Sequence, residues 1–201
     1  MMKNINGFFR KLILSGYSRL FDVVIFAILL IFVHFAYIWW SSAGFPPIKH
    51  LIDKLFAFAS VILFEQSVWI VQNLFGVDIT TQGQTIFFST LNNQQGFVAV
   101  DPGCTSLKQW VHWIVLMILF PGPWKHKIWY IPAGVVVIHF VNLVRITGLV
   151  ATTIPFPLHF DFFHNYIFKT FFYFMIFVMW VIWVEFFRNK SKRVTDAEVM
   201  N

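Results

Sequence analysis

Long apolar runs separated by short polar connections dominate the pattern of the chain. Four of these runs, residues 21–40, 104–122, 128–151 and 164–187, can supply the roughly 20 residues that a helix needs to cross a bilayer. Tryptophan and tyrosine lie toward the ends of three of them, where such side chains favour the membrane interface. The pattern predicts an all-α polytopic membrane protein with about four transmembrane helices.

A fifth apolar run, residues 51–75, differs from the others because it contains several polar and charged side chains. They are Asp53, Lys54, Glu65, Gln66, Gln72 and Asn73. So many polar groups are unfavourable in a helix that faces lipid. We therefore expect an interfacial or re-entrant helix on the outer side of the membrane. The alternative is a fifth full span, which would put the N-terminus outside.

Residues 76–103 form the only sizeable polar connection. Two β-prone runs, residues 86–91 and 97–100, flank the sequence NNQQG at residues 92–96. Such a pattern is typical of a β-hairpin with a glycine-containing loop, and an irregular loop is the alternative. We expect a small extracytoplasmic hairpin whose second strand leads directly into Asp101–Cys104.

Composition indicates that lipid is the solvent for most of the chain. Hydrophobic residues make up 58% and charged residues 12% of its 201 residues, and a soluble domain of this length could not bury so much apolar surface. No linker-like segment or internal repeat divides the chain, so residues 1–201 are expected to form a single integral membrane domain. The single cysteine excludes an internal disulfide and a cysteine-based zinc site.

The net charge of +6 comes mostly from basic residues at the edges of the apolar runs, which does not suggest nucleic acid as a partner. The clusters are Lys3, Arg10, Lys11 and Arg19; Lys125 and Lys127; and Arg188, Lys190, Lys192 and Arg193. The positive-inside rule places all three clusters, and with them both termini, in the cytoplasm. On this topology Cys104, Arg145 and His164 come together at the outer face.

Cys104 lies at the start of the third run, after the pair Asp101–Pro102. Aspartate followed by proline is typical of a helix N-cap and first helical position. Cys104 would then be the third helical residue, where the helix dipole and Lys108, four residues on, would lower its thiol pKa. This favours a nucleophilic thiolate. A packed, unreactive thiol is the alternative, since lone cysteines in apolar proteins are often of that kind.

Arg145 is an unusual residue in an otherwise apolar run. His139, Asn142 and Arg145 recur at three-residue spacing, which puts them on one helical face that should contact other helices. Arg145 could bind an oxyanion or a substrate carboxylate, or it could instead extend to the outer interface. His139, deeper in the run, is expected to make a structural hydrogen bond.

His164 opens the last run and could accept the proton of Cys104 and later protonate a leaving amine. An interfacial histidine without a role is the alternative. His159 and His112 are competing candidates for the same function. Asp161 could orient a histidine or cap a helix, and Glu65 and Gln66 could line an outer cleft, although structural hydrogen bonds suit them better.

Metal and cofactor chemistry find little support in the sequence. The histidines are scattered, no HExxH pattern occurs, and there is no glycine-rich phosphate loop, so we expect neither a metal nor a cofactor. Intramembrane polar groups would also suit a small proton-coupled transporter, but four spans without a repeat are few for alternating access. A non-catalytic membrane subunit with a structural polar network is a further alternative.

Three separated features resemble the exosortase/archaeosortase family, most closely the short exosortases. They are Cys104–Thr105 at a helix start, the block PGPWKHKIWYIPAGVVVIHFVNLVRI at residues 121–146, and His164 opening the final helix; together they cover residues 102–187. The family more often has Ser-Gly where this chain has Thr105–Ser106.

The resemblance implies a membrane cysteine transpeptidase of the bacterial cytoplasmic membrane. It would act on exported proteins with a C-terminal tag made of a short motif, a transmembrane helix and a basic cluster, and would pass the product to an unidentified amine acceptor. It also implies that Cys104 is the nucleophile, Arg145 the essential cation and His164 the acid and base.

Overall fold

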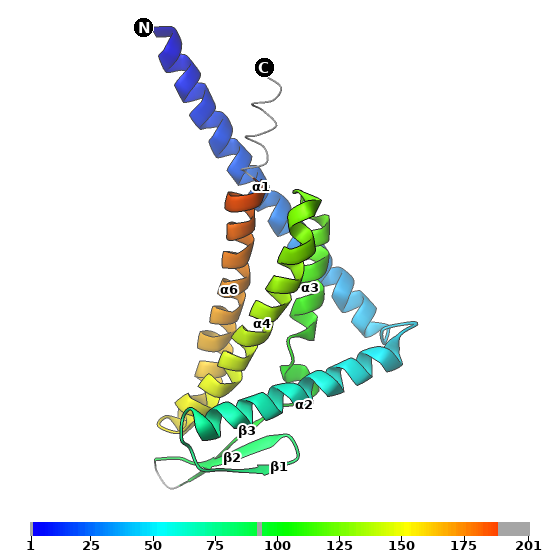
Figure 1. Cartoon of the computed structure of the whole chain (residues 1–201), viewed down its shortest axis with the longest axis vertical. Helices are drawn as coiled ribbons and strands as arrows, with labels where there is room; N and C mark the ends of the chain where they lie inside the picture. The colour runs from blue at the N-terminus through cyan, green and yellow to red at the C-terminus, as the bar shows by residue number, and fades with distance from the viewer. Residues whose placement is uncertain (1, 92–93, 189–201) are drawn as a thin grey trace.

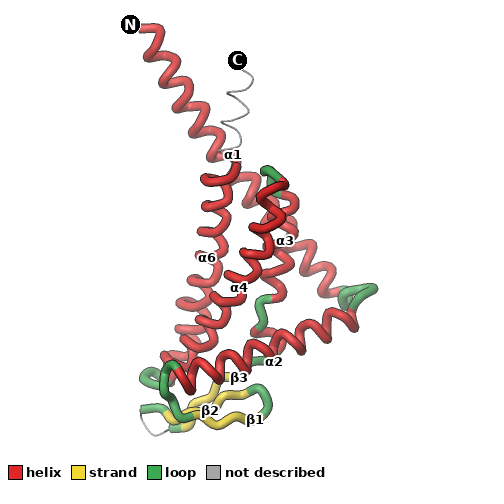
Figure 2. Tube along the Cα trace, in the orientation of Figure 1, coloured by secondary structure: helices red, strands yellow, loops and turns green. Residues whose placement is uncertain are grey.

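The computed structural model describes residues 2–91 and 94–188, and it is helical except for one small sheet (Figure 2). The long helices are α1 (Met2–Ser42), α2 (Lys49–Asn73), α3 (Leu107–Leu119), α4 (Trp124–Thr153) and α6 (Lys169–Ile182). Shorter helical turns are η1 (Pro102–Cys104), η2 (Pro157–His159), α5 (Phe160–Phe162), η3 (Phe163–Phe168) and η4 (Trp183–Arg188). The prediction of an all-α polytopic membrane protein is confirmed.

Within the described residues, four helical segments are long and apolar enough to cross a membrane, but they are not the four expected. They are Leu20–Ser42, Lys49–Asn73, Trp124–Thr153 and Pro157–Phe187. The predicted span at residues 104–122 is reduced to α3, whose 13 residues extend about 20 Å at 1.5 Å per residue, against a bilayer core of roughly 30 Å. Pro121 explains its end, because Phe120 is already extended at ψ 136° before this proline, and the extended Thr105 at ψ 154° explains why α3 begins only at Leu107.

The run at residues 51–75 forms one continuous helix, α2, which crosses the lower end of the bundle at a steep angle to α3, α4 and α6 (Figure 1). Its buried residues, Ser60, Leu63, Ser67 and Val71, recur every three or four positions and so form one narrow stripe. The polar hydroxyl of Ser67 can be buried there because it donates to the Leu63 carbonyl at 2.7 Å. The interfacial position of α2 in a membrane stays a prediction.

The main core joins α3, α4 and α6 through large aromatic side chains. Trp113 of α3 packs against Tyr130 of α4, with ring centroids 5.9 Å apart, and its indole N–H donates to the Ile131 carbonyl at 3.2 Å. Gly134 makes this contact possible, because a Cβ there would overlap the Trp113 ring. The Tyr130 hydroxyl in turn donates to the Met179 carbonyl of α6 at 2.7 Å.

The turn between α3 and α4 is stabilised by Lys127. Its side chain is 2% exposed, and its ammonium group donates to the carbonyls of Ile118 and Phe120 at 3.1 and 2.7 Å. These carbonyls belong to the end of α3 and lack helical partners, so a cation is favoured there. Lys127, which the sequence predicted only as part of a cytoplasmic basic cluster, therefore also caps α3.

The sheet has three antiparallel strands, in the order β1 (Ile79–Gln82), β2 (Thr85–Ser89) and β3 (Gln95–Ala99). The predicted hairpin is β2–β3, and residues 92–93 of its loop lie outside the described residues. Strand β1 was missed because its sequence, ITTQ, is mostly polar and exposed. The inner face of β2 and β3 packs with α2 and α4 in a second core of Ile86, Phe88, Val98, Leu63 and Leu143, among others.

The two ends of the bundle differ in what they contain. The start of α1, the turn before α4 and the end of η4 lie at one end, whereas the sheet, η1, the end of α4 and η3 lie at the other (Figure 1). The basic turn before α4 therefore lies at the opposite end from the elements that carry Cys104 and His164. Lys190, Lys192 and Arg193 lie outside the described residues, and which end faces the cytoplasm stays a prediction.

Candidate active site

Cys104 lies in η1, a single helical turn capped by Asp101. The Asp101 carboxylate accepts from the Cys104 N–H at 3.0 Å, and Pro102 occupies the first position, so the predicted cap is confirmed. The turn does not continue into α3, because Thr105 is extended at ψ 154° and α3 begins only at Leu107. The prediction that Cys104 is the third residue of a long helix is therefore wrong, and it receives little support from a helix dipole.

The thiol of Cys104 is half-buried and protonated at rest. Its Sγ donates to the Ala99 carbonyl of β3 at 3.6 Å. Burial is the largest influence and raises the pKa of the Cys104 thiol, and the Asp101 carboxylate adds to this rise. A hydrogen bond with the Asp101 backbone and the charge of Arg145 lower the same pKa by less. The prediction of a lowered thiol pKa is wrong, because burial outweighs the charge of Arg145, and Lys108 is not among the groups that shift this pKa.

Alkylation measures the protonation state of this thiol directly. Because the pKa of Cys104 is raised, only a small thiolate fraction exists near neutrality, and that fraction grows with pH. We expect the iodoacetamide labelling rate of the detergent-purified protein to rise roughly tenfold per pH unit between about pH 6 and 8. Cys104→Ala supplies the unlabelled blank. A rate that is already constant near pH 6 would contradict the buried, protonated thiol.

Asn142 of α4 connects the cysteine segment with the arginine. Its side-chain amide donates to the Cys104 carbonyl at 2.9 Å, and its oxygen accepts from Arg145 Nη1 at 3.5 Å. Asn142 is buried, at 1% exposure, and both contacts are partly buried. His139 lies on the same face and contacts Gln66 of α2. The predicted face of His139, Asn142 and Arg145 does contact other elements of the fold.

Arg145 and His164 are in direct contact. Arg145 Nη2 donates to His164 Nε2 at 2.8 Å, so Nε2 must act as the acceptor and carry no proton in this arrangement. The imidazole is neutral, with its proton on Nδ1. No hydrogen bond joins His164 to Cys104 in the described part of the chain. The resting site therefore holds a separated thiol and imidazole, with arginine bound to the imidazole.

Two features of the fold hold His164 in place. It lies in η3, a π-helical turn in which the chain is locally widened, as is common near functional sites. The Phe160 ring stacks on its imidazole, with centroids 5.7 Å apart and planes 7° apart. The i, i+4 spacing of these two rings could have suggested this contact from the sequence.

Arg145 has a nitrogen atom available for a further ligand. Its Nε is buried and has no hydrogen-bond partner among residues 2–91 and 94–188. Both Cys104 and Tyr173 lie within electrostatic range of the guanidinium. A buried donor without a partner is unfavourable, which is consistent with a position where a substrate oxygen would bind.

The other predicted residues lie elsewhere. The Lys108 ammonium is 5.4 Å from the centre of the Tyr37 ring, and the Lys108 carbonyl accepts from His112 Nδ1 at 2.6 Å. The His139 side chain contacts α2, where its Nε2 lies 2.8 Å from Gln66 Oε1. Asp161 is exposed but within electrostatic range of His164. The exposed His159 contacts the Phe156 ring, and Glu65 lines a shallow hollow on α2. Of the three candidate histidines, only His164 contacts Arg145.

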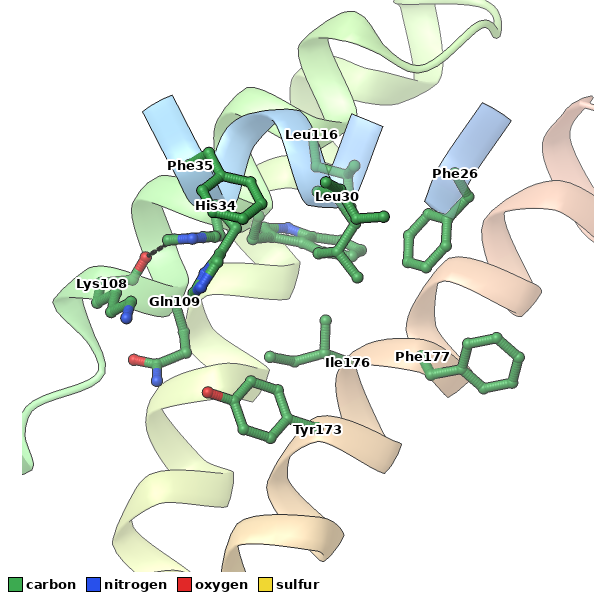
Figure 3. Close-up of a pocket in the computed structure, with 13 residues that line it drawn as sticks. Phe26, Leu30, His34, Phe35, Lys108, Gln109, Leu116, Tyr173, Ile176 and Phe177 are labelled. Carbon is green, nitrogen blue, oxygen red and sulfur yellow. Dashed lines mark hydrogen bonds between the residues drawn. The ribbon is translucent and has the colours of Figure 1, made fainter. Parts of the chain in front are cut away.

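A separate cavity of about 410 Å³ lies between α1, α3 and α6 (Figure 3). Its walls are mostly apolar, with Phe26 and Leu30 from α1, Leu116 from α3 and Phe177 from α6. Lys108 and Gln109 form part of a more polar end, together with Tyr173 (Figure 3). Cys104, Arg145 and His164 are not among its lining residues. Lys108 thus belongs to this cavity rather than to the cysteine.

The comparison with known families supports the assignment suggested by the sequence. A family model described as transmembrane exosortase (Exosortase_EpsH) matches residues 9–181. The match reaches well beyond the resemblance at residues 102–187 and includes most of α1 and all of α2 and the sheet. No curated protein and no solved structure gives a significant match. Because the family match covers most of the chain, the protein belongs to the transmembrane exosortase family.

Proposed function

We propose that this protein is a membrane cysteine transpeptidase that cleaves exported proteins bearing a C-terminal tripartite tag and transfers the product to an amine acceptor. Membership of the exosortase family supports a membrane transpeptidase-like role in general. The observation that carries the specific proposal is one continuous hydrogen-bonded chain. It runs from the main-chain carbonyl of Cys104 through Asn142 and Arg145 to His164.

The resting contacts suggest how the nucleophile is activated. The Cys104 thiol is protonated, and the Nε2 lone pair of His164 is occupied by Arg145. A substrate carbonyl oxygen that binds the Arg145 Nε–H, unpaired among the described residues, and also draws the Nη2–H away from the imidazole would release Nε2. The free lone pair can then take the thiol proton as sulfur attacks the carbonyl carbon. Activation would thus depend on substrate, and the thiol would stay unreactive without it.

The remaining steps follow from the same groups. Arg145 stabilises the oxyanion of the tetrahedral intermediate, which carries one negative charge on the former carbonyl oxygen. The C–N bond breaks, His164 gives its Nε2 proton to the leaving amine, and a thioester remains on Cys104. An acceptor amine then attacks the thioester and loses a proton to His164, and the departing Cys104 sulfur takes that proton back. Water in place of the amine would give hydrolysis.

The topology would assist this reaction. We place both termini in the cytoplasm and the site at the outer face, because the turn with Lys125 and Lys127 lies at the opposite end of the bundle from η1 and η3 (Figure 1). A substrate held in the same membrane by its own transmembrane helix would present its cleavage site at a constrained depth. Such tethering raises its effective concentration at Cys104.

The acyl-enzyme tests the proposal. A reporter fused to the tripartite tag of an exported protein from the source organism would be co-expressed with the wild-type chain. We expect a covalent adduct that hydroxylamine releases and that disappears in Cys104→Ala, because only a thioester on this single cysteine has both properties. Processing of the reporter without such an adduct, and without loss in Cys104→Ala, would overturn the proposal.

A non-catalytic membrane subunit is the second candidate. The raised pKa of Cys104 and its contact with the Ala99 carbonyl favour it, because both are properties of a structural thiol. The two candidates differ in the experiment above: a structural subunit forms no adduct. It would also tolerate Cys104→Ala when its assembly with partners is measured.

A further inference from the structure

Strand β3 has an open edge whose backbone groups can be assigned from the register. The Val100 N–H donates to the Gln84 carbonyl at 2.8 Å, and β3 pairs with β2 so that Val98 faces Ile86. In an antiparallel ladder, hydrogen-bonded pairs alternate with non-hydrogen-bonded ones. Val98 therefore bonds to β2, whereas the N–H and C=O groups of Phe97 and Ala99 point away from it, toward the open edge.

The open edge leads directly to the candidate nucleophile. The Ala99 carbonyl, which points along this edge, accepts from Cys104 Sγ at 3.6 Å. The chain turns back through η1, so the thiol lies beside the last residue of β3 rather than beyond it. Phe97 is two residues from Ala99, or about 7 Å at the rise of a strand. Among residues 2–91 and 94–188, Phe97 thus presents an unpaired main-chain donor and acceptor within a short distance of the thiol.

We infer that the recognition segment of the substrate binds as an added strand along the open edge of β3. This inference rests on the proposed function, since the added strand is the tagged polypeptide that Cys104 attacks. Main-chain hydrogen bonds to Phe97 hold the segment in an extended conformation, as in other cases of β-strand addition. Its next peptide group then reaches the Cys104 thiol and the Arg145 guanidinium.

The properties of the edge fit a peptide backbone. Exposed sheet edges are normally blocked by charged side chains, proline or a bulge, because they invite pairing with other chains. Residues 95–99, QGFVA, contain no charge and no proline, and β3 pairs regularly with β2 over its full length. Phe97 is 61% exposed and pairs with Phe87 at a ring distance of 6.1 Å, which offers an apolar contact to alternate side chains of an added strand.

Proline substitution tests the role of the edge. Phe97→Pro removes the outward N–H without removing a bond to β2, and proline is tolerated at such edge positions. We expect processing of the tagged reporter to fall roughly tenfold, the effect of about 1.4 kcal/mol. Thr81→Pro is the matched control. Thr81 lies in β1, the strand at the opposite edge of the same sheet. Thr80 and Gln82 form the hydrogen-bonded pairs with β2, so the N–H and C=O groups of Thr81, which alternates with them, point away from the sheet.

Three results would overturn the inference while leaving the proposed function intact, provided that Cys104→Ala still abolishes processing. The first is full processing by Phe97→Pro. The second is an equal loss in Phe97→Ala, which would assign the effect to the ring. The third is an equal loss in Thr81→Pro. If Cys104→Ala itself is processed normally, the proposed function fails instead.

Disulfide trapping gives a second measurement that does not depend on how well Phe97→Pro folds. The variant would carry Cys104→Ala, which removes the native thiol, together with Gln95→Cys in β3. It would be co-expressed with reporters that each carry one cysteine at a different position of the motif. Neighbouring strands bring Cα atoms to about 4.5–5.5 Å, a distance that a disulfide can bridge, and side chains alternate between faces. We expect cross-linking to peak at one position of the motif, with much weaker products two positions away and least at the adjacent positions, whose side chains face the other side. Cross-linking at consecutive positions with equal yield, or none at all, would contradict strand addition.

Discussion

Replacing Cys104 with alanine is expected to lower tag-dependent processing by a factor on the order of 10⁴ or more, the loss seen when a nucleophile is removed from a catalytic group. The chain has one cysteine, so no second thiol can substitute for it. Its side chain makes one weak hydrogen bond, to the Ala99 carbonyl, and alanine should therefore leave the fold intact. Conversion of the tagged reporter, followed by mass spectrometry of its new C-terminus, measures the effect.

Cys104→Ser is the companion variant, because it keeps the hydrogen bond to Ala99 and changes only the nucleophile. A serine hydroxyl lacks the intrinsic nucleophilicity and acidity of a thiol, so we expect Cys104→Ser to be nearly as inactive as the alanine variant. Membrane levels of both variants should equal those of the wild type. Normal processing by Cys104→Ala would identify the cysteine as structural.

Arg145→Gln is expected to lower processing by roughly 10²–10³-fold, the loss typical of one oxyanion donor. The substitution removes the contacts to Asn142 and His164 together, so it also releases the imidazole from its resting position. Arg145→Lys retains the charge but lacks the planar fork that reaches both partners. We expect its activity to lie between those of the wild type and Arg145→Gln.

Lys125→Gln is the control for a lost positive charge on the same helix. Lys125 is exposed, lies in the first turn of α4 at the far end of the bundle, and has no contact with the site. We expect it to process the reporter at the wild-type rate. If Arg145→Lys were fully active while Arg145→Gln were inactive, charge alone would suffice. The hydrogen-bonded chain from Cys104 to His164 would then have no role in catalysis.

Several parts of this protein follow from its amino-acid sequence through local physical rules. Apolar length predicted membrane helices, and Asp101–Pro102 predicted a capped turn, because an aspartate oxygen can bind the free N–H groups at a helix start. Three-residue spacing placed Asn142 and Arg145 on one face, since α-helices have 3.6 residues per turn. The hairpin followed from β-prone residues around a glycine-containing loop.

Other features required the tertiary structure because they depend on contacts between distant segments. The pKa of Cys104 is raised by burial, which outweighs the charge of Arg145. Lys108, on which the sequence prediction partly rested, lies over the Tyr37 ring instead. His164 was distinguished from His112 and His159 only by its contact with Arg145, which depends on how η3 packs on α4. The open edge of β3 beside the thiol follows from pairing and chain direction, and neither can be read from local periodicity.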